Sequence, residues 1–168
     1  MQPGEALDVA AQVAVTLAGF AGIVVVFRPE SVHRWAEIDR FRLRLLLANS
    51  AVPLVWALFG ILLLTVDPVP ANIWRWCSGC ALIVVIPLII FNASGARRFF
   101  QSDPQIISKF TYYPIALLGT AATLLQLINI VWWNRFAPFF FIIFVYLVAG
   151  IAQFLRMLLL PPQGADST

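Results

Sequence analysis

Two cysteines three positions apart form the one motif in this sequence with a recognised chemistry. Cys77 and Cys80 make a C-x-x-C in the segment WRWCSGCALIVV. Residues three apart lie on one face of a helix, so the two sulfurs would be close together. A thiolate in such a pair attacks disulfides, which makes Cys77 and Cys80 the candidate catalytic residues. The alternative is that both are small apolar side chains packed within a helix.

Other reactive arrangements are absent from the sequence. It contains one histidine, His33, one lysine, Lys109, and no G-x-S-x-G segment. A metal or haem site needs several ligands, and no cluster of histidine, cysteine and carboxylate residues provides them. We therefore expect no metal and no cofactor, and the sequence favours a protein that is not an enzyme.

The composition is that of an integral membrane protein. Hydrophobic residues make up 61% of the 168-residue chain, charged residues 11%, and the mean hydropathy is +0.89. Soluble domains are about a quarter charged. The net charge of +3 is better explained by orientation in a membrane than by binding to nucleic acid, so no nucleic-acid partner is expected. The opening MQPGEALD carries acidic residues where a signal peptide needs basic ones, so the first apolar stretch should remain in the mature protein.

Five apolar stretches are long enough, or nearly long enough, to cross a bilayer as helices, which needs roughly 20 residues. Segments with turn-forming residues separate them: RPES, DPVPAN, SDPQ and NRFAP. Only helices or closed barrels satisfy the backbone within lipid. The sequence thus predicts one all-α domain over residues 1–160, a polytopic membrane helical bundle followed by a short polar tail at 161–168. The predicted spans are 9–27, 45–66, 74–94, 111–133 and 138–160.

Basic residues predict how the bundle is oriented. With five spans, the first loop (28–44), the third loop (95–110) and the C-terminal end share one side, which holds nine of the eleven basic residues. The positive-inside rule then places the N-terminus outside and the C-terminus inside, with a bacterial inner membrane as the expected location. An aromatic belt at the outer interface agrees with this orientation. It consists of Trp74, Trp76, Trp132 and Trp133.

The charged segment between the first two spans has two interpretations. Residues 31–41 read as a short helix on the inner membrane surface, with Ser31 as its N-cap. In the first interpretation the arginines contact lipid headgroups and fix orientation. In the second they form a specific site for a ligand that bears phosphate. The residues concerned are Arg34, Arg40, Arg42 and Arg44.

The first span has one face of small residues and another of polar residues. The small residues repeat every four positions, a pattern that lets helices approach closely. The polar residues also repeat every four positions, and they either bond to neighbouring spans or line an aqueous path between several copies. The small set is Ala10, Ala14, Ala18 and Gly22, and the polar set is Asp8, Gln12 and Thr16.

Amides form two further belts on either side of an apolar centre. Gln126 and Asn129 lie toward the outer side, whereas Asn49, Asn92 and Gln153 lie toward the inner side. Amides in lipid need partners, so we expect them to face protein and to hold spans together. Prolines inside the second and third spans should kink them.

Two resemblances follow from these motifs. The run VTLAGFAGIVVVFR, followed by W…DRFRL…LL, resembles uncharacterised small multi-pass bacterial membrane proteins, which implies a membrane location. The position of the C-x-x-C resembles membrane thiol oxidoreductases of the disulfide-bond-forming and vitamin K epoxide reductase types. Those proteins generally relay electrons through a second cysteine pair, which this chain lacks.

Three functions remain open from the sequence. The first is a homo-oligomeric membrane assembly without enzymatic activity, such as an ion channel or pore built around the polar face of the first span. The second is an accessory subunit of a larger membrane complex. The third is a membrane thiol–disulfide oxidoreductase that uses the cysteines at 77 and 80.

Overall fold

The fold is a bundle of five long helices. A computed structural model describes residues 2–27, 31–102 and 109–159, and over 95–102 and 109–112 it describes the backbone only. No strand occurs in these ranges. The helices and turns are α1 (Pro3–Phe27), the 3₁₀ turn η1 (Val32–Arg34), α2 (Glu37–Leu64), α3 (Ile73–Ser102), α4 (Lys109–Ile128), the π-helical turn η2 (Asn129–Trp133) and α5 (Phe136–Leu159).

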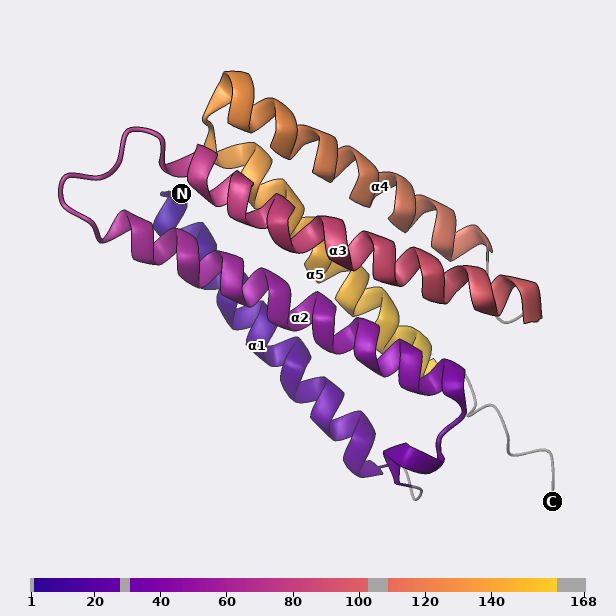
Figure 1. The fold of residues 1–168 in the computed structure, drawn as a ribbon. Helices are drawn as coiled ribbons and strands as arrows, with labels where there is room; N and C mark the ends of the chain where they lie inside the picture. The colour runs from indigo at the N-terminus through magenta and orange to yellow at the C-terminus, as the bar shows by residue number, and fades with distance from the viewer. Residues whose placement is uncertain (1, 28–30, 103–108, 160–168) are drawn as a thin grey trace, which may run out of the picture.

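All five long helices are long and apolar enough to cross a membrane. This confirms the predicted all-α, five-span architecture and makes the chain a multi-pass membrane protein. The helices alternate in direction, so the start of α1, the α2–α3 connection and the α4–α5 turn share one end of the bundle (Figure 1). The predicted tail at 161–168 lies outside the described residues.

The two ends of the bundle differ in side-chain chemistry. The aromatic end carries Trp76, Trp132 and Trp133, all of them exposed, while Trp74 packs inward against Phe136. The basic end is the opposite end, where η1 joins α1 to α2 and where α5 finishes (Figure 1). It carries the arginines of the charged segment and of the last turn of α5, namely Arg34, Arg40, Arg42, Arg44 and Arg156.

The separate surface helix predicted over 31–41 is wrong. The chain forms only the short turn η1, and α2 begins at Glu37, well before the predicted start at residue 45. Ser31 is the N-cap of η1, but its side chain makes no capping hydrogen bond. Trp35 is 5% exposed and packs in a small cluster with Leu46 and other residues of α1, α2 and α5. Burial of this tryptophan inside the bundle draws the segment inward, away from a position along the membrane surface.

Helices α1, α2 and α5 form the closely packed part of the bundle. At Gly60 an added Cβ would lie 2.8 Å from Leu7 Cδ1 and 3.3 Å from Phe139 Cε1, so three helices meet where only glycine fits without a shift. Ala10 and Ala14 are buried in the same core. The N-terminal half of the small-residue face therefore packs within a single chain. Its other half is more open, since Ala18 is half-buried and Gly22 is exposed.

The orientation predicted from the basic residues can be tested by labelling from one side of the membrane. Asp67→Cys lies in the exposed loop at the aromatic end and Ser31→Cys is exposed at the basic end. In a background with Cys77→Ala and Cys80→Ala, an impermeant maleimide added to intact cells should label Asp67→Cys only. Ser31→Cys should react after the membrane is opened. The reverse pattern would place the N-terminus inside.

Candidate functional site

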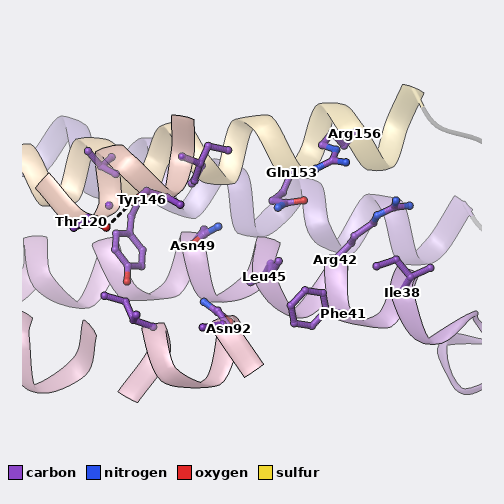
Figure 2. A pocket seen from close by; sticks show the side chains of 17 residues that line it. Ile38, Phe41, Arg42, Leu45, Asn49, Asn92, Thr120, Tyr146, Gln153 and Arg156 are labelled. Carbon is purple, nitrogen blue, oxygen red and sulfur yellow. Dashed lines mark hydrogen bonds between the residues drawn. The ribbon is translucent and has the colours of Figure 1, made fainter. Parts of the chain in front are cut away.

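A cavity of about 390 Å³ lies between α2, α3, α4 and α5, in the half of the bundle that faces the basic end. Its size falls within the range of about 300–1,000 Å³ that is usual for small-molecule sites. Figure 2 shows Tyr146 and Thr120 at one end of the cavity, Asn49 and Asn92 in the middle, and arginines at the other end.

Small residues on the facing helices leave this space open. Ala93 of α3, Ala116 and Gly119 of α4 and Ala149 of α5 all line the cavity. A Cβ added at Gly119 would meet no atom within 4 Å. Helix α3 also has few contacts with α5 compared with the contacts between α2 and α5. The cavity therefore exists because its walls lack side chains large enough to fill it.

Close packing of α2 against α5 positions one wall of the cavity. An added Cβ at Gly150 would lie 3.5 Å from Asn49 Cβ and 3.6 Å from Asn49 O, which is ordinary van der Waals contact, so α2 and α5 lie close together at this level. Pro53 has no N–H, so it cannot donate the helical hydrogen bond to the Asn49 carbonyl. Tyr146, one turn before Gly150, stands edge-on to Trp56 with ring centroids 5.1 Å apart. This ring contact fixes the direction of the Tyr146 hydroxyl.

The aromatic end of the bundle is closed by a buried hydrogen-bond network. Ser78 Oγ donates to Gln126 Oε1 at 2.8 Å and accepts from Asn129 Nδ2 at 2.8 Å. Gln126 Nε2 also donates to Pro138 O at 2.7 Å. Ser78, Gln126 and Asn129 are all fully buried. The network joins α3, α4 and α5, and its amides act as the interhelical contacts that the sequence predicts.

The turn between α4 and α5 belongs to the same arrangement. Asn129 accepts a hydrogen bond from Arg135 N at 2.8 Å through Oδ1. Asn134 takes a left-handed backbone conformation, with φ of 47°, which asparagine tolerates better than most residues. Its side chain donates to Ala71 O at 2.7 Å and accepts from Arg75 N at 3.2 Å. These bonds fasten the α4–α5 turn to the start of α3.

Unlike the amides of the buried network, the amides and the tyrosine that line the cavity lack hydrogen-bond partners among the described residues. Asn49, Asn92 and the Tyr146 hydroxyl make no hydrogen bond with any residue that the structure describes. Gln153 Oε1 is wholly buried and has no partner in the described part of the chain. Polar groups inside a membrane protein need partners, so these groups leave hydrogen-bonding capacity directed at the cavity.

Arginines mark the basic end of the cavity. Arg42 is 6% exposed and forms an ion pair with Asp39, which is 2% exposed, at 3.2 Å. Arg156 of α5 is half-buried and makes no ion pair with a residue in the described ranges. Among the described residues that line the cavity there is no aspartate or glutamate. The described lining at this end therefore carries positive charge.

The four arginines predicted to meet lipid headgroups are in three different environments. Arg34 and Arg44 are exposed, and Arg40 is half-buried. Arg42 is buried and lines the cavity. Arg34 and Arg44 have the exposure that is typical of headgroup contact, whereas Arg42 lines the cavity.

The polar residues predicted on the first span lie away from the cavity. Asp8, Gln12 and Thr16 are exposed on α1, and none of them lines the cavity. Thr16 Oγ1 donates to Gln12 O at 2.8 Å, a bond within the helix. In a single chain this face has no helix packed on it among the described residues.

The two cysteines are free, and they are not equally accessible. Cys77 is fully buried in the core cluster and Cys80 is half-buried. Among the described residues no group of three histidine, cysteine, aspartate or glutamate side chains could hold a metal ion. Cys77 therefore occupies the packed position of the alternative interpretation, and a soluble disulfide would not reach its sulfur in this conformation.

Sequence reasoning found the amides but not the cavity. It assigned all of them to contacts between helices, whereas Asn49, Asn92 and Gln153 come from three helices and line one space. The only sequence feature that pointed to a shared site was the position of all three amides toward the same predicted side of the membrane. Nothing in the pattern singled out Tyr146, and Arg156 served only as one more basic residue at the inner end.

Comparisons with protein-family models, with curated proteins and with solved structures found no match for this chain. Inferences about its function therefore rest on its own residues and geometry.

The buried network predicts that removing a single hydroxyl group lowers the stability of the protein. Ser78→Ala leaves Gln126 Oε1 without its donor inside the bundle, and an unsatisfied buried group costs about 1–3 kcal/mol. We expect the apparent melting temperature in mild detergent to fall by several degrees. The control is Ser94→Ala, whose exposed hydroxyl bonds only to Phe91 O on its own helix. Equal melting temperatures for both variants would mean that the network adds no stability.

Proposed function

We propose that this multi-pass membrane protein binds a polar small molecule in the cavity between α2, α3, α4 and α5. The observation that supports the proposal is the group of unpartnered polar side chains, contributed by three helices, around one space. Structural amides in the same protein are fully bonded, as Gln126 and Asn129 show. The cavity amides have no such structural use.

Energetics favour an occupied cavity. A buried polar atom without a partner, such as Gln153 Oε1, costs about 1–3 kcal/mol. Asn49, Asn92 and Gln153 supply both donors and acceptors, because each carries a carbonyl oxygen and an NH₂ group. Water or a ligand with hydroxyl or carbonyl groups would satisfy them. A hydrocarbon chain would not.

The geometry fits binding from one end better than a path through a single chain. The cavity lies toward the basic end, and the network of Ser78, Gln126 and Asn129 fills the bundle toward the aromatic end. At the same end of the bundle, the aromatic ring of Trp74 packs against those of Phe136 and Phe139. A molecule that enters from the basic end would therefore leave from the same end.

Access of water to the cavity tests this function directly. In a background with Cys77→Ala and Cys80→Ala, Asn92→Cys should react with a charged methanethiosulfonate reagent, because that reaction needs a thiolate in contact with water. Ile90→Cys is the matched control, since Ile90 is 66% exposed and lies one turn or less away on α3, but does not line the cavity. It should stay unreactive in the bilayer. Equal inertness of both variants would refute the proposal.

A second candidate function rests on the exposed polar face of α1. Asp8, Gln12 and Thr16 lie on the outside of the single chain, although α1 is apolar enough to span the membrane. Polar side chains that face lipid are stabilised when another helix covers them. Further copies of this chain around that face would make a homo-oligomer, and a channel if the face enclosed water. A different protein on the same face would make this chain an accessory subunit.

The mass of the purified protein distinguishes these arrangements. Light scattering in mild detergent should give a protein mass that is a multiple of the 18.7 kDa chain. Gln12→Leu combined with Thr16→Val should shift that mass toward one chain, because it removes the polar contacts. Val15→Leu, at an exposed position of α1 beside them, is the control and should keep the assembly. A wild-type mass of one chain would exclude the oligomer.

A further inference from the structure

Among the described residues, positive charge at the basic end of the cavity exceeds the negative charge beside it. Arg42 is paired with Asp39 at 3.2 Å, while Arg156 lines the same cavity without an ion-pair partner among the described residues. Figure 2 shows both guanidinium groups at the same end of the cavity. A partly buried guanidinium in a low-dielectric setting attracts an anion strongly. The ligand should therefore carry negative charge at this end.

The number of donors favours phosphate over a smaller anion. The guanidinium of Arg156 presents up to five N–H donors in a planar fork, which matches the oxygens of phosphate in pairs. The amide of Gln153 lies next to these arginines in the cavity wall, one turn before Arg156 on α5. A carboxylate offers two oxygens, whereas a phosphate monoester offers three strong hydrogen-bond acceptors.

The depth of the cavity limits the rest of the ligand. From Arg42 to Asn49 the axis of α2 rises by about 10 Å, and from Arg156 to Tyr146 the axis of α5 spans about 15 Å. Beyond the arginines, the walls combine amides and hydroxyls with aliphatic residues such as Ile89 and Ile115. The ligand thus needs oxygen atoms behind its phosphate and an apolar portion against the aliphatic walls.

We infer that the cavity binds a phosphate ester of a glycerol-like polyol, with the phosphate between Arg42 and Arg156. This inference rests on the proposed function and names the ligand class of the same site. A volume of about 390 Å³ accommodates the phosphate and glyceryl region but not two complete acyl chains. The shared chemistry has two sources, a phospholipid with a small headgroup and a soluble polyol phosphate.

Thermal unfolding with defined probes tests the inference. The chain has six tryptophans, so their fluorescence reports unfolding of the protein in neutral detergent. Dioctanoyl phosphatidic acid should raise the melting temperature in a saturable way, and dioctanoylglycerol, which lacks the phosphate, should not. A matching increase with glycerol 3-phosphate identifies a soluble ligand. An increase with phosphatidic acid only identifies a lipid. Both results support the phosphate site.

Two pairs of variants locate the binding in the cavity. Arg156→Gln should weaken the apparent affinity for the effective probe by at least about tenfold, or about 1.4 kcal/mol. Arg44→Gln, an exposed arginine outside the cavity, should keep it. Gly119→Leu should abolish binding by filling the cavity, and Gly79→Leu is its control because a Cβ there also meets no atom within 4 Å. The Gly119 variant keeps the test decisive if Arg156→Gln does not fold.

The outcomes separate the ligand class from the proposed function. Equal stabilisation by dioctanoylglycerol, or unchanged affinity in both Arg156→Gln and Gly119→Leu, would overturn the phosphate site. If Asn92→Cys still reacted with the charged reagent, the proposed function would stand and only the ligand class would be wrong. If Asn92→Cys were as inert as Ile90→Cys, the proposed function would fail as well.

Discussion

The requirement that buried polar groups have partners governs this bundle more than any other constraint. In hydrocarbon no water replaces a missing hydrogen bond, so the position of each amide matters energetically. At the aromatic end Ser78, Gln126 and Asn129 bond to one another and to the backbone. Toward the basic end Asn49 and Asn92 have no such bonds with the described residues. In the half toward the aromatic end, the amides of this network have hydrogen-bond partners within the protein. In the other half, the amides at the cavity leave hydrogen-bonding groups that a ligand could use.

Glycines have opposite effects in these two parts of the protein. Gly60 and Gly150 lie where helices touch, since an added Cβ would come within 3.3 Å of a neighbouring side chain or closer. At Gly119 the same atom would meet nothing, because the facing helices stand apart. Helices α1, α2 and α5 thus pack closely together, and α3 and α4 enclose the cavity against α2 and α5. Small residues alone predict neither outcome, because close approach and open space both need them.

Hydropathy and turn residues were sufficient to predict the five spans and the all-α class, because lipid imposes the same length and polarity on every spanning helix. Burial of particular residues was not predictable in that way. Trp35 enters the bundle and eliminates the expected surface helix over 31–41, and Arg42 is buried and lines the cavity. Both outcomes depend on contacts with α5, about a hundred positions further along the chain. A pattern read within one segment contains no information on such contacts.

The concentration of charge between Arg28 and Arg44 now has a structural explanation with two parts. Arg34 and Arg44 are exposed, where they suit the orientation of the bundle in the membrane. Asp39 and Arg42 are buried as a pair at the first turns of α2. Because a buried pair contributes little net charge, the positive character of the cavity depends on Arg156, which arrives from α5. The predicted orientation therefore depends on the charged segment, whereas the proposed anion site uses that segment and the C-terminal helix together.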